Sequence, residues 1–467
     1  MEYFSTRGRA PVAGFETVLL QGLAPDGGLY LPNSWPSLSA EDIRAFRNQD
    51  YAEVAASILL KFTGDAFDFE RLRTLTREAY AEFDPRNAAP LTEVGREDWI
   101  LELFHGPTLA FKDFAMQILG RLFDDVLERR GKRQTIIAAT SGDTGAAAIE
   151  ALKSCAYVDV VILHPKGRVT DVQRRIMTSV DAPNVLNLSV EGSFDDCQWI
   201  VKDLFADRDF VEQVGLSGVN SINWARLAAQ TVYYFTAAMA ISADNEPISY
   251  VVPTGNFGDV FAGYAAKQMG LNVAKLGVAT NANDILHRAM TTGDYVPASV
   301  RATTSPSMDI QVASNFERLL FDVLNRDADV LRDRMEAFKE IKDLRLNEEE
   351  RGRISEVFAS AAVDDETTRR EIKSHYEDTG ALIDPHTAVG RVAAKRLREN
   401  GMMTGKIVTL STAHPAKFPD AVRDATGVTP ELPARYADLF TRPEKMTDAP
   451  ATVGAVKSLI LSAFDRT

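Results

Sequence analysis

Apolar runs typical of buried strands alternate with helical patterns between residues 95 and 325, and this alternation constrains the fold more than any other feature. The six runs are Trp99–Phe104, Thr135–Ala139, Val158–Leu163, Val185–Leu188, Ile248–Val252 and Leu276–Ala279. Strands that alternate with helices are typical of parallel sheets whose faces are covered by helices. We therefore expect an α/β fold, with ligands at the carboxyl ends of the strands.

The chain is too long for one compact core, since it has 467 residues, and two or three domains are expected. A charged segment at about 325–380 has the apolar spacing of amphipathic helices. It predicts a helical insertion in the sequence of the catalytic core, which forms a solvated outer layer. The expected division is a mostly helical N-terminal cap (1–93), a catalytic core of two subdomains (94–420) and a C-terminal segment (421–467).

Lys112 lies just after a Gly-Pro turn and between two phenylalanines, Phe111 and Phe114. An amine flanked by apolar rings is costly to keep charged, so we expect a low pKa, as a lysine that attacks a carbonyl needs. Pyridoxal phosphate is the natural aldehyde partner for such an amine. The alternative is a lysine that extends from an amphipathic helix to solvent.

Two loops in the sequence have the composition of anion sites. Thr140–Gly145 and Pro253–Asp259 each follow a predicted strand and precede a predicted helix. Such turns expose backbone N–H groups to an anion. The alternative for the first loop is an ordinary turn in which Ser141 or Asp143 caps the helix. The second loop is neither G-x-G-x-x-G nor a P-loop, which argues against a dinucleotide or a nucleoside triphosphate.

The lysine, the hydroxyl loop and the glycine loop, in this order, resemble the fold-type II pyridoxal-phosphate enzymes (tryptophan synthase β-like). Within that group they resemble the threonine synthases of the bacterial and fungal type. Asp143 fits this branch, because the wider group usually has asparagine there. Further matching segments are Tyr3–Gly8, Asp26–Pro32, Glu102–Ala115, Asn220–Leu227, Ser305–Ile310, Ser314–Arg318, Asp384–Val389 and Ser411–Phe418.

The resemblance implies a set of cofactor-binding residues. Lys112 would bind pyridoxal 5'-phosphate covalently and then act as the general base. Thr412 would face the pyridine nitrogen, and a hydroxyl there leaves that nitrogen mostly neutral; the alternative is a threonine that caps its own backbone. The cofactor phosphate would be held by Gly255, Asn256, Phe257, Gly258 and Asp259.

The resemblance also implies a substrate site. Ser141, Asp143 and Thr144 would receive the substrate carboxylate, with Asp143 either protonated or accepting from an N–H at the helix start. The substrate phosphate would be bound by Asn220, Ser221, Asn223 and Arg226, where the planar fork of Arg226 suits phosphate. No role is assigned to His105, His386 or His414.

The implied activity is conversion of O-phospho-L-homoserine and water to L-threonine and phosphate, the last step of threonine biosynthesis. One alternative is a phospho-lyase that releases 2-oxobutanoate and would keep every motif named above. Another is a serine/threonine dehydratase or cysteine synthase, against which Ser5–Gly8 and Ala413–Phe418 count. A non-catalytic binding protein is disfavoured by the presence of Lys112 and both loops.

Composition narrows the partners. A net charge of −14 argues against nucleic acid and anionic membranes, so a phosphorylated substrate needs a local site. The scattered histidines and the two cysteines, Cys155 and Cys197, predict neither a metal site nor a disulfide framework. No apolar leader precedes the first motif, and the longest apolar helical stretch, 231–241, is too short for a bilayer. We expect a cytoplasmic monomer or homodimer that acts on a small molecule.

Overall fold

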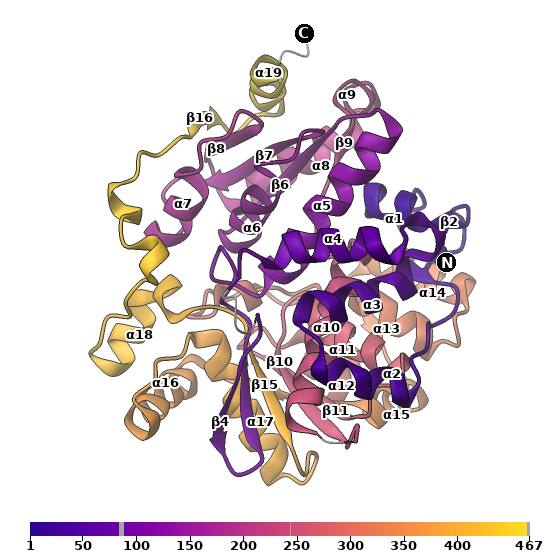
Figure 1. Cartoon of the computed structure of the whole chain (residues 1–467), viewed down its shortest axis with the longest axis vertical. Coiled ribbons are helices and arrows are strands. Elements are labelled where there is room, and N and C mark those ends of the chain that lie inside the picture. Colours follow the sequence, from indigo (N-terminus) through magenta and orange to yellow (C-terminus); the bar gives the residue numbers. More distant parts are fainter. Residues whose placement is uncertain (84–87, 243, 465–467) are drawn as a thin grey trace.

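The computed structural model describes residues 1–83, 88–242 and 244–464, and two parallel sheets organise this part of the chain. The five-stranded sheet has the order β16-β8-β7-β6-β9 and lies in the upper half of Figure 1. The six-stranded sheet has the order β14-β11-β10-β15-β5-β4 and lies in the lower half. All pairs are parallel except β4 with β5. The predicted α/β class is therefore confirmed.

The strands of the six-stranded sheet are β4 (Leu91–Gly95), β5 (Asp98–Glu102), β10 (Ile248–Pro253), β11 (Val273–Thr280), β14 (Phe358–Ala362) and β15 (Ile407–Ser411). Those of the five-stranded sheet are β6 (Gln134–Ala139), β7 (Val158–Pro165), β8 (Val185–Glu191), β9 (Leu216–Ser217) and β16 (Thr447–Pro450). The six strands predicted in the core are all present, with ends that differ by a few residues.

Helices cover both sheets (Figure 1). Those of the core are α5 (Lys112–Arg130), α6 (Asp143–Leu152), α7 (Asp171–Thr178), α8 (Phe194–Ala206), α9 (Arg208–Val214), α10 (Trp224–Ile241), α11 (Gly258–Gln268), α12 (Ile285–Thr291), α13 (Phe316–Val323), α17 (Pro385–Glu399) and α18 (Pro419–Thr426). Short 3-10 turns include η3 (Pro306–Met308), η4 (Pro415–Lys417), η5 (Ala434–Tyr436) and η6 (Leu439–Thr441). No helix in the described part of the chain combines the length and apolarity needed to cross a membrane.

The N-terminal region is less helical than predicted. Its helices are α1 (Phe15–Gln21), α2 (Ala40–Ala45), α3 (Tyr51–Thr63) and α4 (Phe69–Tyr80). Its first residues also form a three-stranded antiparallel sheet of β1 (Glu2–Ser5), β2 (Ala13–Gly14) and β3 (Tyr30–Pro32). These strands are too short for their alternation to stand out in the sequence, so the prediction missed the sheet.

The charged segment at 325–380 is not only an outer helical layer. It contains α14 (Ala328–Ile341), α15 (Glu348–Val357) and α16 (Asp365–Thr379), and β12 (Asp294–Tyr295) pairs with its β13 (Leu344–Arg345). It also supplies β14, which pairs in parallel with β11 at the edge of the six-stranded sheet. β14 consists mainly of alanine and serine, which have little strand preference, so pairing with β11 decides its conformation.

Helix α5 connects the N-terminal region to the core. It packs against α4, α6 and α10, and Phe114 in its first turn is fully buried. The Phe114 ring lies 5.3 Å from Tyr51, 4.6 Å from Phe83 and 5.7 Å from Tyr233, measured between centroids. These contacts fix the helix whose first residue is Lys112.

Candidate active site

The expected cofactor residues and the expected substrate residues follow strands of different sheets. Lys112 follows β5, Thr412 follows β15 and the 253–259 loop follows β10, and these three strands are neighbours in the six-stranded sheet. Residues 141–144 follow β6 and residues 220–226 follow β9, which are neighbours in the five-stranded sheet. Each half of the site is therefore built at the carboxyl edge of one parallel sheet.

The loop before Lys112 is fixed to the end of β15. Ala110 and Ala413 form an isolated antiparallel bridge. The Phe111 N–H donates to the Thr412 carbonyl at 2.9 Å, and the His414 N–H donates to the Leu109 carbonyl at 3.0 Å. This pairing holds Thr412 beside Lys112, as expected if both contact one ring-shaped ligand.

The Lys112 amine is nearly buried, with its side chain 12% exposed. Its Nζ lies 5.0 Å from the centroid of the Phe111 ring and 3.5 Å from Oδ2 of Asp143. Burial lowers the pKa of Lys112; Asp143 opposes this effect, and the positive charges of Lys417 and Arg226 add to it. The lowered pKa of Lys112 agrees in direction with the sequence prediction. Of the two phenylalanines, Phe111 is the aromatic neighbour of the amine, because Phe114 packs into the core.

The Asp143 carboxylate forms ion pairs with two lysines. From the sequence we expected instead a protonated group, or one that accepts from an N–H at the helix start. The fully buried Lys417 places Nζ 2.6 Å from Asp143 Oδ1. Gln173 donates to the same oxygen at 2.8 Å. Although burial alone would raise it, the pKa of Asp143 is held well below its usual range by Lys417 and Lys112. Lys417 belongs to the matching segment Ser411–Phe418. Its position soon after a predicted strand was the one sign in the sequence that it could reach the site.

The start of α6 is shaped by a glycine. Gly142 caps the helix with φ of 137°, and a Cβ there would lie 2.6 Å from Cδ of Gln173. Thr140 Oγ1 accepts from the N–H groups of Gly142 and Gly145 at 3.0 and 2.9 Å. Ser141 is exposed and Thr144 is half-buried, so both hydroxyls lie where a ligand can reach them.

The glycine loop owes its shape to a phenylalanine as well as to glycines. Phe257 has φ of 65°, in the left-handed region, and α11 begins at Gly258. A Cβ on Gly255 would lie 2.7 Å from the Ser307 carbonyl oxygen, so Gly255 permits the close approach of η3. Asn256 is exposed. The loop and the N-terminus of α11 remain the expected place for an anion.

The Asp259 carboxylate is directed into the core. Tyr233 and Tyr234 donate their hydroxyls to its Oδ1. Burial raises the pKa of Asp259 to about 6. Only the backbone of Asp259, in the first turn of α11, is placed as the sequence expectation requires.

Arg226 is buried with unused hydrogen-bonding capacity, whereas Asn223 is engaged by the fold. The Arg226 side chain donates from Nη1 to the Val219 carbonyl at 2.9 Å, and its Nε has no partner among the described residues. Burial lowers the pKa of Arg226 to about 10. Asn223 caps α10 by accepting from Ala225 N–H at 3.0 Å, and its amide donates to the Leu19 carbonyl at 2.8 Å. Asn220 is exposed and Ser221 half-buried.

The three histidines of the matching motifs have structural partners. His386 Nε2 accepts from the Ser307 N–H at 3.2 Å, and its Nδ1 lies 2.7 Å from Asp384 Oδ1. His105 Nε2 lies 2.8 Å from Glu102. His414 caps η4 by accepting from Ala416 N–H at 3.2 Å, and burial lowers its pKa to about 4.

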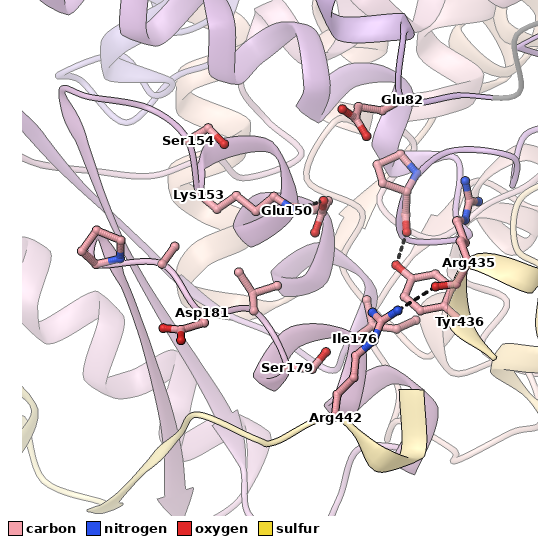
Figure 2. Close-up of a pocket in the computed structure, with 14 residues that line it drawn as sticks. Glu82, Glu150, Lys153, Ser154, Ile176, Ser179, Asp181, Arg435, Tyr436 and Arg442 are labelled. Atoms are coloured by element: carbon pink, nitrogen blue, oxygen red, sulfur yellow. Dashed lines mark hydrogen bonds and ion pairs between the residues drawn. The ribbon is translucent and has the colours of Figure 1, made fainter. Parts of the chain in front are cut away.

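A cavity of about 550 Å³ is lined by residues from α6, α7 and the C-terminal segment, and by Pro107 in the loop before Lys112 (Figure 2). Tyr436 donates its hydroxyl to the Pro107 carbonyl. Arg435 donates to the carbonyls of His105 and Gly106. The C-terminal segment therefore braces the loop that leads to Lys112. The cavity wall contains Pro107 but none of the expected site residues.

A nearly buried lysine and a glycine-rich loop that follow neighbouring strands of a parallel sheet are the arrangement expected of a pyridoxal-phosphate enzyme of fold-type II. The family model described as pyridoxal-phosphate dependent enzyme matches residues 87–359. Models described as threonine synthase N terminus and threonine synthase, C-terminal match residues 2–80 and 387–460. The chain belongs to the threonine synthase family.

Relatives of known name agree over nearly the whole length. Threonine synthase of Pseudomonas aeruginosa is 48% identical, with 98% of each chain covered. Among solved structures, pyridoxal-phosphate-bound threonine synthase from Brucella melitensis superposes with a TM-score of 0.96 and 49% identity, covering 99% of both chains. Threonine synthase from yeast gives 0.94 and 37%, covering 100% of this chain and 99% of the other.

Proposed function

We propose that the protein converts O-phospho-L-homoserine and water to L-threonine and phosphate. The observation that supports this most is the buried guanidinium of Arg226, whose Nε has no partner among the described residues. The cofactor phosphate needs one site, for which α11 and its loop suffice. Arg226 supplies a separate buried guanidinium from the other sheet, and its unpaired Nε suits a second phosphate, on the substrate.

The cofactor site is proposed to consist of Lys112, Thr412 and the 255–259 loop. Lys112 binds the aldehyde, the backbone of the loop and the start of α11 bind the phosphate, and Thr412 faces the ring nitrogen. When bound, pyridoxal phosphate supplies an electron sink for charge that develops on the substrate. Every donor in this set lies at the carboxyl edge of β5, β15 or β10.

The substrate site is proposed to take both ends of the substrate from the other sheet. Ser141, Thr144 and the first turn of α6 bind its carboxylate, while Asn220, Ser221 and Arg226 bind its phosphate. Asp143 and Asn223 lie in the same segments, but their side chains are engaged by Lys417 and Lys112, and by Ala225 and Leu19. We assign these two residues to shaping the site.

Proton transfer is proposed to fall to Lys112. Its neutral amine removes a proton from Cα and then one from Cβ, and phosphate leaves from Cγ. Cγ then takes up a proton, the hydroxyl of water adds at Cβ while its proton goes to phosphate, and Cα regains a proton. Burial of Lys112 favours the neutral amine that this role needs. The fixed positions of Lys112 and the two anion sites supply the orientation.

The test is a product assay with O-phospho-L-homoserine that scores threonine, 2-oxobutanoate and phosphate together. Equal amounts of threonine and phosphate are expected. Release of 2-oxobutanoate in place of threonine would make the protein a phospho-lyase, and turnover of unphosphorylated serine or threonine alone would place it with the dehydratases.

The domain division and the cellular setting are also proposals. Residues 1–93 are taken as the cap, 94–420 as the catalytic core and 421–467 as the C-terminal segment. We place the enzyme in the cytoplasm, as a monomer or homodimer. Sedimentation of the purified holoenzyme tests the oligomeric state.

A further inference from the structure

The Asp143 carboxylate lies between two lysine ammonium groups at unequal distances. Its Oδ1 is 2.6 Å from Nζ of Lys417, and its Oδ2 is 3.5 Å from Nζ of Lys112. Gln173 strengthens the first contact by donating to Oδ1 at 2.8 Å. On the second side, Ser307 donates to Oδ2 at 3.4 Å. The carboxylate is therefore bound tightly on the side away from Lys112.

Lys417 is held in place by the fold around it. Its side chain is fully buried, and Nζ also donates to the Thr108 carbonyl at 2.8 Å. Its own carbonyl accepts from the Thr170 hydroxyl at 3.4 Å. Thr108 lies in the loop before Lys112, and Thr170 caps α7 beside the five-stranded sheet. Lys417 thus contacts the loop before Lys112 through Thr108, the start of α6 through Asp143, and the start of α7 through Thr170.

We propose that Lys417 is a positioning residue that binds Asp143 and keeps it from pairing tightly with Lys112, so that the Lys112 amine is free to react as a neutral nucleophile. This rests on the proposed role of Lys112 in binding the cofactor. It explains how the fold keeps a buried carboxylate beside the Lys112 amine, because Lys417 neutralises the charge of Asp143.

The groups around Lys112 decide the sign of the effect. They are Asp143 on α6, Lys417 on η4, Arg226 on α10 and Asp259 on α11. Lys417 and Arg226 repel a proton on Lys112, whereas Asp143 attracts one. Removing Lys417 removes a positive charge that repels the protonated Lys112. It also leaves Lys112 as the one lysine, among the described residues, that pairs with Asp143. Both changes favour the charged amine, so the pKa of Lys112 must rise.

The experiment uses four variants: Lys417→Met, Asp143→Asn, the double variant, and Lys457→Met as a control. Lys457 on α19 (Val453–Ala463) and Asp207 at the start of α9 form a partly exposed ion pair of 2.5 Å, which includes none of the expected site residues. Each protein is stripped of cofactor, and pyridoxal phosphate is added back across a range of pH. The rate of covalent attachment is followed by visible absorbance, and its midpoint pH reports deprotonation of Lys112.

The expected shifts have opposite signs. The midpoint should rise by about one pH unit in Lys417→Met, because one neighbouring charge within about 6 Å shifts a buried group by this order. It should fall in Asp143→Asn and return close to the wild-type value in the double variant. Lys457→Met should not move it. An unchanged or lowered midpoint in Lys417→Met would overturn the proposal.

Breaking one side of a buried ion pair can prevent folding. If Lys417→Met does not fold, the comparison of Asp143→Asn with the double variant decides, because the lysine still repels Lys112 in that background. The midpoint must then be higher in the double variant, and equal midpoints would refute the role of Lys417. The assay contains no substrate, so its outcome is separate from that of the product assay.

Discussion

Asn315 donates from its side-chain amide to the Ser221 carbonyl at 3.2 Å and to the Asn256 carbonyl at 3.1 Å. Ser221 follows β9 of one sheet, and Asn256 follows β10 of the other. One buried amide therefore couples the proposed substrate loop to the proposed cofactor loop. Arg318 orients this amide by donating to Oδ1 of Asn315.

Asn315→Ala is accordingly expected to weaken both ligands at once. Loss of buried hydrogen bonds costs about 1–3 kcal/mol, so cofactor affinity and kcat/KM should each fall by about tenfold or more. Cofactor titration and steady-state kinetics measure the two effects. Asn272→Ala, which alters an exposed asparagine with surface partners, is the control. An effect on one ligand alone would show that the loops are not coupled through Asn315.

Lys112→Ala should abolish turnover and the visible absorbance that the cofactor gains when it is bound covalently. The reason is that Lys112 is the nearly buried amine at the edge of β5, with Phe111 against it. Spectra before and after borohydride treatment provide the measurement, with Lys153→Ala as a surface control. Borohydride-sensitive absorbance in Lys112→Ala would assign the cofactor to another lysine.

Arg226→Ala should leave cofactor binding nearly unchanged while lowering kcat/KM for phosphohomoserine by about two to three decades, as expected for loss of a charge-assisted contact. Lysine at this position should recover only part, because it lacks the planar fork. Arg318 provides the contrast, since its guanidinium already donates to Tyr30, Ile222 and Asn315. Loss of cofactor from Arg226→Ala with normal turnover of the remaining holoenzyme would reverse the two phosphate assignments.

Gly142→Ala should destabilise the protein by about 1–3 kcal/mol, because a side chain at positive φ is strained and would meet Gln173. Moving Gln173 also removes a donor from Asp143. Thermal unfolding measures the cost. Gly352→Ala is the matched control: it lies inside α15 with open space around it, and a gain of about 0.5–1 kcal/mol is expected. Equal stabilities of the two variants would contradict the strain at Gly142.

His375 should make the fold sensitive to mild acid. It is 3% exposed, and burial lowers its pKa from 6.5 to about 4. Below pH 6.5 the unfolded chain takes up a proton that the folded state refuses, so stability falls as the pH drops towards 4. The loss at pH 4 should approach about 2–3 kcal/mol. Denaturant unfolding of wild type and His375→Gln between pH 7 and pH 4.5 should show a shallower slope for the variant; identical slopes would rule the residue out.

Local sequence determined the alternation of strands and helices and the position of each site segment after a strand. Thr135–Ala139 and Ile248–Val252 are short apolar runs next to Gly-containing turns, and this length and these flanking residues are typical of a buried strand. Helix α3 also has a clear signal in the sequence, because its apolar positions recur with the helical period and Asp50 caps it. The positions of Lys112 and of both expected anion loops after strands could be predicted for the same reason.

Tertiary structure alone decided which atoms face one another. Asp143 and Lys417 lie far apart in the chain, and only the packing of the two sheets brings them to 2.6 Å. The turning of Asp259 towards Tyr233 and Tyr234, and the left-handed conformation of Phe257, likewise depend on neighbours from other elements. β14 forms a strand because β11 offers it a partner. Periodicity is a property of one segment and can be seen in its own residues. The partner of a buried charge, the orientation of a side chain and the pairing of an edge strand depend on residues from other segments, so no local pattern specifies them.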